Sequence, residues 1–354
     1  MSTVRNITPH PLAPVTAVEV VLPGVVEPAG LQVRSRVLAE PGPGQVLVTV
    51  EASGVSFAEQ SMRRGRYPGQ PTFPFVPGYD LVGTVTRLGT GVDPALAGRR
   101  VAAMTKTGGW ASHVLLTGAD VVTVPDGLDP AEVETLVVNG VTAWQMLHRK
   151  ARVRPGQTIL VHGANGGVGN TLAQLARHHG VKVIGTAAPR HHEALRAMGA
   201  IPIDYDDPEL AARVRELAPD GVDAVFDHLG GESIDRSWSV LAPGGTLVSY
   251  AIASALKDSG AVLPSFFALV AKLAWWSVLP NGRKATFYDL WAGHGLRPRA
   301  FSARLRQDLG AVLGLLADGT LTPHVAARLP LTQAREAMEL AESRTVYGKV
   351  VLVP

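Results

Sequence analysis

The chain of 354 residues contains no cysteine. It therefore forms no disulfide, offers no thiolate nucleophile and lacks the cysteine ligands of structural zinc sites. Its formal net charge is only +3, and it has no dense basic stripe interleaved with aromatic residues of the kind that nucleic acid requires. We expect no nucleic-acid partner, while the small excess of positive charge would favour an anionic cofactor.

No run of apolar residues is both long and uninterrupted enough to predict a membrane span. Residues 261–280 come nearest, but Lys272 interrupts them and Pro264 and Pro280 bracket them. We expect this segment to be buried or to form a subunit interface, rather than to contact a membrane. Residues 1–14 also lack the apolar core of a secretory signal, so the expected location is cytoplasmic.

Length and composition predict a folded protein of two domains. The apolar fraction is 46%, the charged fraction is 18%, and 354 residues exceed what one hydrophobic core usually organises. In the first part of the chain, glycine and proline turns separate short strands, which indicates a barrel-like or sandwich domain. These strands are expected at 45–50, as a strand pair over 80–92, and at 101–104 and 113–116.

Beyond residue 129 the pattern changes to alternating strands and helices. Asp129 and Pro130 begin a predicted helix over 131–148. Strands that alternate with helices of about 10–15 residues form a parallel sheet. The chain ends in an apolar strand, which indicates a return to the first domain. After the first helix, the expected strands lie at 158–162, 181–186, 201–204, 222–228, 246–250 and 349–353, and the helices at 170–179, 189–198, 208–217 and 233–241.

Residues 163–169 form a glycine-rich turn that reads Gly-Ala-Asn-Gly-Gly-Val-Gly, between a predicted strand and a predicted helix. Glycines let the backbone turn tightly and approach a pyrophosphate. The N-terminus of the helix that follows offers free N–H groups and a positive dipole end. This setting predicts a dinucleotide site that includes Asn165, Gly166, Gly167 and Val168. An ordinary strand-to-helix turn is the alternative.

The residues that follow the second strand of this unit favour NADPH over NADH. A site that prefers NAD places Asp or Glu there to hold the ribose hydroxyls, but no acid follows Thr186 before Glu193. Arg190 stands there instead, next to two histidines, and its guanidinium suits a 2′-phosphate. The alternative is an exposed arginine at the start of a helix.

Six sequence blocks occur in order around the glycine turn. They are GVSFAE at 54–59, RRGRYP at 63–68, PGYDLVGTV at 77–85, NGVTAW at 139–144, DHLGG at 227–231 and GKVV at 348–351. In this order they resemble the medium-chain dehydrogenase/reductase superfamily, in its zinc-independent quinone oxidoreductase and enone reductase branch. The resemblance implies an α/β protein with a β-rich GroES-like barrel domain (1–137 and 290–354) and a Rossmann domain with a doubly wound parallel sheet (138–289).

The same resemblance implies a protein without a metal centre. Zinc alcohol dehydrogenases carry a Cys ligand in the block that here holds Ser56, and a His in the block that here holds Tyr79. The lobe with four structural cysteines is absent as well. Neither replacement is an ordinary zinc ligand, so we expect no metal site.

The resemblance also assigns roles to individual residues. Negative charge that develops on an acceptor oxygen needs hydrogen-bond donors, and the hydroxyls of Tyr67, Tyr79, Ser56 and the cofactor's ribose are candidates. Tyr67 is the first catalytic candidate, followed by Ser56 and Glu59. Aromatic residues within 266–276, with Tyr288 and Trp291, are expected to line the site of a bulky apolar acceptor. A homodimer is also expected. Together with Thr186 and Arg190, the expected cofactor contacts beyond the glycine turn are Thr142, Tyr205, Ser249, Tyr250, Arg344 and Lys349.

The chemistry that the resemblance implies is hydride transfer from NADPH to a quinone, or to the carbon–carbon double bond of an enone or enal. Two alternatives stay open. The chain is a zinc-independent reductase of ketones and aldehydes, or it is a scaffold that binds NADPH without turnover.

Overall fold

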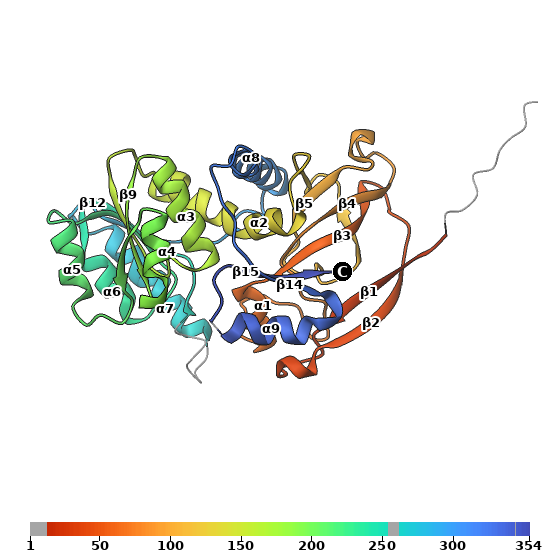
Figure 1. The fold of residues 1–354 in the computed structure, drawn as a ribbon, viewed down its shortest axis with the longest axis horizontal. Coiled ribbons are helices and arrows are strands. Elements are labelled where there is room, and N and C mark those ends of the chain that lie inside the picture. The colour runs from red at the N-terminus through yellow and green to blue at the C-terminus, as the bar shows by residue number, and fades with distance from the viewer. Residues whose placement is uncertain (1–12, 254–261, 344) are drawn as a thin grey trace, which may run out of the picture.

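A computed structural model describes residues 13–253, 262–343 and 345–354. The molecule is longest in one direction, and a sheet-based half lies at each end (Figure 1). Within the described residues, one half contains a six-stranded parallel sheet and the other a seven-stranded mixed sheet. A separate antiparallel pair, β1 (Val15–Val21) and β2 (Gln32–Leu38), lies beside the mixed sheet.

The parallel sheet has the strand order β10-β9-β8-β11-β12-β13. Every neighbouring pair runs in the same direction, and the order reverses between β8 and β11. This is the doubly wound arrangement, so the predicted α/β fold with a Rossmann-type sheet is confirmed. The strands are β8 (Thr158–Val161), β9 (Lys182–Ala187), β10 (Ile201–Asp204), β11 (Val222–Asp227), β12 (Leu241–Ser249) and β13 (Lys284–Phe287).

Helices cover the parallel sheet (Figure 1). The helix after the glycine turn begins at Gly167, three residues before the predicted start at 170, because Gly166 already has the extended backbone of an N-cap (φ −79°, ψ 165°). The helices are α3 (Gly167–His178), α4 (His192–Ala197), α5 (Leu210–Leu217), α6 (Glu232–Ser239) and α7 (Val262–Ser277).

Helix α7 contains most of the apolar segment 261–280. One face packs on the core through Leu269 and Leu273, but Phe267 and Trp275 on another face are each 65% exposed. Burial of the whole segment, one of the two expectations for it, is therefore wrong, and its use as a subunit interface stays a prediction. Across the described ranges, none of the helices combines the length and the apolar character needed to cross a membrane.

The mixed sheet has the order β14-β15-β3-β4-β5-β7, with β6 paired to β3. The predicted strand pair over 80–92 is wrong: these residues supply one strand, β4, whose partners are β3 and β5, and the turn at Gly89 and Gly91 follows it. The elements of this half are β3 (Gln45–Val55), α1 (Phe57–Arg63), β4 (Asp80–Leu88), β5 (Arg100–Met104), β6 (His113–Thr117), β7 (Val122–Thr123), β14 (Val325–Pro330), α9 (Ala334–Ser343) and β15 (Lys349–Val353).

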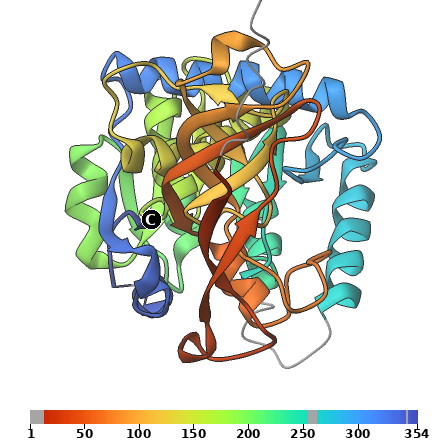
Figure 2. The same ribbon diagram turned by 90° about the vertical axis from the view of Figure 1, so that its right-hand side faces the viewer.

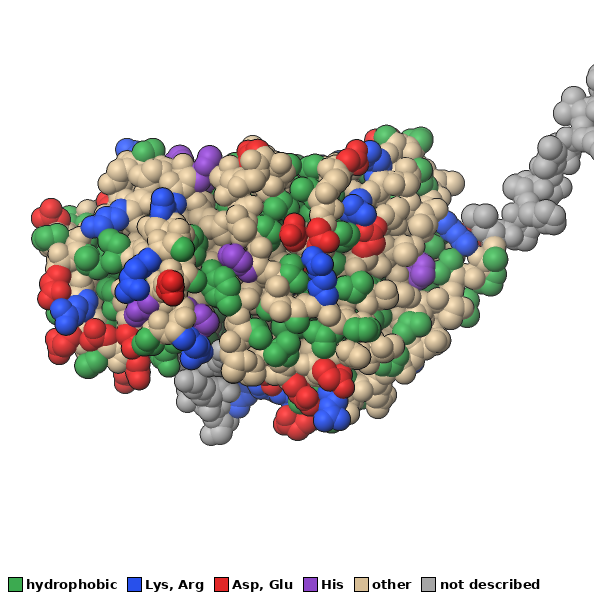
Figure 3. Space-filling view, viewed as in Figure 1, with side chains coloured by type: hydrophobic (Ala, Val, Ile, Leu, Met, Phe, Trp, Pro, Cys, Tyr) green, Lys and Arg blue, Asp and Glu red, His purple; other side chains and the backbone are tan. Residues whose placement is uncertain are grey.

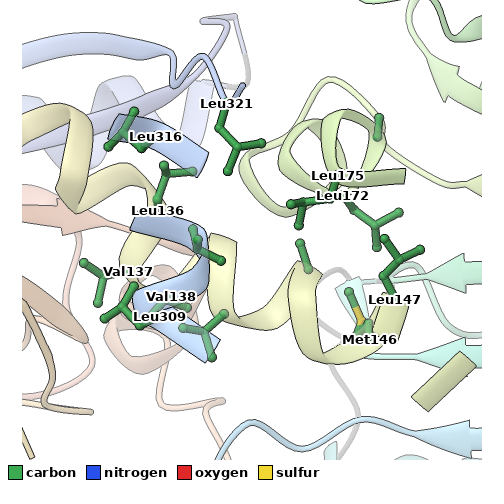
Figure 4. Close-up of a cluster of buried hydrophobic side chains, with 14 of the residues drawn as sticks. Leu136, Val137, Val138, Met146, Leu147, Leu172, Leu175, Leu309, Leu316 and Leu321 are labelled. Carbon is green, nitrogen blue, oxygen red and sulfur yellow. The ribbon is translucent and has the colours of Figure 1, made fainter. Parts of the chain in front are cut away.

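Two helices, α2 (Pro130–Trp144) and α8 (Pro298–Ala317), lie between the halves (Figure 1). Figure 2 shows α8, in blue, running across the top of the molecule. The Asp129 side chain caps α2 by accepting from two backbone N–H groups, and a π-helix, Gln145–Ala151, continues it. Figure 4 shows the apolar side chains where α2, the π-helix, α3 and α8 meet. They include Leu136, Val137, Val138, Met146, Leu147, Leu172, Leu175, Leu309, Leu316 and Leu321.

This shared core fixes the start of α3, and with it the glycine turn, relative to the mixed sheet. The predicted boundary at residue 137 falls inside α2, which packs on elements of both halves. The division into domains at 1–137 with 290–354 and at 138–289 stays a prediction.

Charged side chains of both signs are mixed on the face seen in Figure 3. Lys and Arg lie among Asp and Glu over both halves, and no broad basic area appears on the described part of that face. This distribution agrees with the small net charge of +3.

Candidate active site

The glycine turn lies between β8 and α3, where the strand order of the parallel sheet reverses. Gly163 has φ +62°, and a Cβ atom there would lie 2.5 Å from Cε1 of His228. A Cβ on Gly167 would lie 2.4 Å from Nδ2 of Asn139. A Cβ on Gly169 would lie 2.3 Å from the Gly163 carbonyl oxygen. Gly163, with its positive φ, and Gly169, packed against backbone, therefore need glycine, and a Cβ at Gly167 would displace the Asn139 side chain. The N-terminus of α3 is left with N–H groups that can bind an anion.

A buried polar network supports the turn from below. The Gly163 N–H donates to Oγ1 of Thr186 at 3.1 Å. His162, which precedes the turn, is hydrogen-bonded through Nε2 to the Ser237 hydroxyl at 3.0 Å, and that hydroxyl donates to Asp227 at 2.7 Å. Burial lowers the pKa of His162, so its imidazole is neutral near pH 7. Thr186, expected to contact the cofactor, thus holds the turn itself.

Four other predicted cofactor residues lie at or just after the carboxyl ends of parallel strands. Arg190 lies in a short 3₁₀ turn after β9 and is exposed, and Tyr205 follows β10 and is 59% exposed. Ser249 ends β12, and its buried hydroxyl has no hydrogen-bond partner within the described residues. Tyr250 comes next and is half-buried. Because these strands are parallel, all four residues lie along the same edge of the sheet as the glycine turn.

Ser56 and Glu59 lie together at the start of α1. The Ser56 hydroxyl accepts from the Ala58 N–H at 3.1 Å and donates to Glu59. Glu59 also accepts from the Ser56 N–H at 2.8 Å and from the Tyr79 N–H at 2.6 Å. Burial, and then the nearby Asp80, raise the pKa of Glu59. One carboxylate oxygen of Glu59 therefore caps α1 at Ser56, and the other binds α1 to the segment that carries Tyr79.

Two tyrosines form a hydrogen-bonded pair beside α1. The hydroxyls of Tyr67 and Tyr79 lie 2.6 Å apart, and the indole N–H of Trp291 donates to the Tyr79 hydroxyl. If Tyr79 donates to Tyr67, the Tyr67 proton is free to point outward. Burial raises the pKa of Tyr67 to about 12, and burial followed by the charge of Tyr67 raises that of Tyr79 further. Both phenols are therefore neutral hydrogen-bond donors near pH 7.

Lys349 belongs to a buried charge cluster. Its ammonium lies 2.9 Å from Oδ2 of Asp80 and 2.7 Å from Oε1 of Glu134. Burial alone would lower the pKa of Lys349, but these two carboxylates raise it. Gly54 makes room, since a Cβ there would lie 2.1 Å from Cε of Lys349. The ammonium is thus committed to two carboxylates, and its expected contact with a cofactor stays a prediction.

The two halves meet at a cavity of about 20 Å³ beside the glycine turn. The Tyr347 hydroxyl accepts from Nδ2 of Asn170 in the first turns of α3 at 2.5 Å. Tyr347 was not expected here, and neither was His324, because both reach the turn from the other half. Arg344 lies outside the described residues. The lining includes Asn139, Asn165, Gly166, Gly167 and Thr171 on one side, and His324, Tyr347 and Lys349 on the other.

The segment that follows β13 links the sheet edge to the two phenols. The Tyr288 N–H donates to the Ser249 carbonyl at 2.7 Å, and Trp291, three residues later, reaches Tyr79. The Tyr288 hydroxyl donates to Gln145 at 3.0 Å, next to Thr142, which is buried on α2.

The α7 aromatics were expected beside the substrate. Phe266 packs edge-on against Phe287, with ring centroids 5.1 Å apart. Trp276 stacks on Trp238, with centroids 4.7 Å apart. Of the aromatic residues expected to line the substrate region, Trp291 is the one whose side chain contacts the phenol pair.

The side chains around Ser56 do not suit a zinc ion. The nearest donors are a serine hydroxyl and two neutral phenols, and both oxygens of Glu59 already accept hydrogen bonds. Zinc sites use Cys, His and carboxylate ligands with free lone pairs. Over the part of the chain that the structure describes, no group of three or more His, Asp or Glu could hold a metal. We therefore derive no step through a metal ion.

Comparisons with known proteins agree with this architecture. Residues 42–126 match the family described as alcohol dehydrogenase GroES-like domain, and residues 198–352 match the family described as zinc-binding dehydrogenase. The chain is 32% identical over 329 residues to the human synaptic vesicle membrane protein VAT-1 homolog. The matched residues cover 92% of this chain and 82% of that protein.

Two solved structures were determined with NADPH. Escherichia coli quinone oxidoreductase has a TM-score of 0.82 and 26% identity, over 95% of this chain and all of that one (100%). A mycobacterial protein has a TM-score of 0.79 and 28% identity, over 96% of this chain and 100% of that one.

A GroES-like mixed sheet joined to a doubly wound parallel sheet defines the class of protein. The chain belongs to the medium-chain dehydrogenase/reductase superfamily. Within that superfamily it is quinone oxidoreductase-like, with the VAT-1 homologs among its relatives.

Proposed function

We propose that this protein binds NADPH at the glycine turn and reduces a quinone, or the carbon–carbon double bond of an enone or enal, without a metal ion. The observation that carries the proposal is the turn at residues 163–169. A Cβ at three of its glycines would lie within 2.5 Å of another atom, it opens onto the N-terminus of α3, and it lies where the strand order reverses. The NADPH in two structures of similar fold supports the choice of cofactor.

The residues at this edge suit the parts of a dinucleotide. The backbone of residues 165–168 would hold the pyrophosphate, and Arg190 would bind the 2′-phosphate, since no acid at the end of β9 would repel it. Tyr205 offers an exposed ring to the adenosine portion. The unpartnered hydroxyl of Ser249 offers a hydrogen bond on the nicotinamide side, where Tyr250 and Thr142 would also lie.

The reaction that we propose needs a hydrogen-bond donor more than it needs an acid. When bound, NADPH would supply a hydride with its two electrons and leave as NADP⁺, while a proton from solvent completes the reduction of the acceptor. The neutral hydroxyl of Tyr67 would donate to the acceptor oxygen as negative charge develops there. Tyr79 and Trp291 would orient that hydroxyl. Ser56 and Glu59 would act by holding α1 in place.

A panel of acceptors tests the proposal. NADPH oxidation, followed by its loss of absorbance, should be rapid with a quinone and an enone and slow with a saturated ketone. The variant Gly169→Ala should abolish it, because the added Cβ would collide with the Gly163 carbonyl, whereas Gly310→Ala on α8, with open space around it, should not. Alcohol formed from the ketone would instead identify a carbonyl reductase. Tight NADPH binding with no oxidation by any acceptor would identify a scaffold.

We also propose that the protein is a homodimer of the cytoplasm. The exposed apolar face of α7, with Phe267 and Trp275, supports a subunit interface. Light scattering coupled to size-exclusion chromatography tests this assembly, and a monomer at every concentration would refute it.

A further inference from the structure

A larger cavity, of about 600 Å³, adjoins the phenol pair through Trp291. Small-molecule sites have volumes of about 300–1,000 Å³ and combine an apolar wall with a few placed polar groups. This cavity has both. The apolar residues that line it come from β5, β6 and the segment after β13, some of them through their backbone, since neighbouring side chains of a strand face opposite sides. They are Ala103, Met104, Val114, Leu115, Leu116 and Trp291. Its charged and titratable lining residues are Lys106, Asp120 and His294.

Lys106 lines this cavity with an unusual backbone. Its φ is +63°, in the left-handed region that lysine rarely adopts. Hydrogen bonds impose this conformation: the N–H groups of Thr105 and Lys106 both donate to the Tyr79 carbonyl, at 2.9 and 3.1 Å, and the Gly108 N–H donates to the Val76 carbonyl at 2.8 Å. The segment that bears one of the two phenols therefore holds Lys106 in place. Residues held in rare backbone conformations cluster at functional sites, so the conformation of Lys106 at the cavity wall favours a role in binding a ligand there.

The ammonium of Lys106 lies between the cavity and the turn that carries Tyr67. A Cβ on Gly69, two residues after Tyr67, would lie 3.8 Å from Nζ of Lys106. Within the described residues, this ammonium makes no hydrogen bond or ion pair. Asp120, the acid of the cavity wall, is already engaged, because the Ser302 hydroxyl donates to it. The cavity thus offers an unpaired cation near the turn that carries Tyr67.

We propose that this cavity holds the acceptor and that Lys106 binds an anionic group on it. The preferred substrate is then a quinone or enone with an apolar body and a carboxylate or phosphate at one end. The apolar body would lie on the wall from Met104 to Trp291. This inference narrows the class of acceptor. That the bound acceptor is reduced rests on the proposed function, whereas its binding in the cavity does not.

Matched acceptors test the proposal directly. The probes are a naphthoquinone with a short carboxylate chain, its methyl ester, and the corresponding phosphate monoester. A charge-assisted hydrogen bond should lower the KM of the acid about tenfold relative to the ester in the wild type. Lys106→Gln should remove that preference and Lys106→Arg should keep it. The phosphate arm identifies which anion fits better, and a preference for either anion over the ester supports the proposal.

Lys106→Asn separates charge from backbone strain, because asparagine tolerates the left-handed region without carrying a charge. This variant should behave as Lys106→Gln does. The proposal is overturned if the wild type prefers neither the carboxylate nor the phosphate to the ester, or if either neutral variant keeps the preference.

Binding without turnover distinguishes this proposal from the proposed function. Calorimetric titration with the acid and with the ester, in the absence of NADPH, should show the same preference. If the acid binds better and no acceptor is ever reduced, the reductase proposal fails and the cavity proposal stands. If neutral quinones are reduced and neither anion is preferred, the reductase proposal stands and the cavity proposal fails.

Discussion

Replacing Lys349 with Met tests the buried charge cluster beneath the candidate site. The Lys349 ammonium contacts Asp80 and Glu134 at 2.9 and 2.7 Å, and all three side chains are buried. Without the ammonium, two buried carboxylates would face each other with no cation between them. Removing one partner of a buried ion pair costs about 3–5 kcal/mol. We expect Lys349→Met to lose about that much free energy of unfolding near neutral pH.

The loss should depend on pH. Burial, and then the charge of Asp80, raise the pKa of Glu134 above its ordinary value, while Lys349 acts to lower it. A carboxyl group whose pKa is higher in the folded state stabilises the fold at low pH, and this contribution is lost as the pH rises through that pKa. Without Lys349 the pKa of Glu134 rises further. The defect should therefore be smaller at about pH 5 than at about pH 8.

Urea unfolding, followed by circular dichroism at both pH values, measures this effect. A second variant serves as the control: adding Glu134→Gln to Lys349→Met should restore part of the lost stability at the higher pH, because a single carboxylate stays charged. A loss below about 1 kcal/mol, or an equal loss at the two pH values, would refute the reasoning.

The remaining predictions concern the same region. Gly54→Ala should destabilise the fold by about 1–3 kcal/mol, because its Cβ would lie 2.1 Å from Cε of Lys349 and 2.4 Å from Oε1 of Glu134. Gly310→Ala, in open space on α8, should instead stabilise it by about 1 kcal/mol, and equal Tm values for the two variants would contradict this. Tyr67→Phe should lower kcat with a quinone about 100-fold, as the loss of one donor to a developing oxyanion does. Since the pKa of Tyr67 is about 12, the wild-type rate should show no titration of this phenol near neutral pH; an unchanged kcat in the variant would remove Tyr67 from the mechanism.

Local sequence patterns predicted five of the six strands of the parallel sheet, but not β13 (Lys284–Phe287). Gly169 faces a contact within its own strand–helix unit, whereas Gly163 and Gly167 face His228 and Asn139 from other segments. The strand pair expected over 80–92 was wrong because the pairing of this segment is not local. Strand β4 pairs with β3, which ends 25 residues before β4 begins, since β3 ends at Val55 and β4 starts at Asp80. No local pattern within 80–92 indicates that distant partner.

The polar contacts of the site were beyond sequence reasoning because they join distant parts of the chain. Lys349 lies 269 positions from Asp80 and 215 from Glu134 in the sequence. Tyr347 reaches Asn170 from 177 positions away. Lys106 occupies a left-handed position that the sequence does not mark with glycine or asparagine, because the constraint is imposed by the carbonyl of Tyr79.

Titration of the protein with NADPH and with NADH tests the central claim most directly. Calorimetry should show NADPH bound at least about tenfold more tightly, as a charge-assisted contact with the 2′-phosphate implies. Arg190→Ala should remove most of that difference and leave the affinity for NADH unchanged. Equal affinity for the two nucleotides in the wild type, or no binding of either, would contradict the assignment of the glycine turn and Arg190 to NADPH.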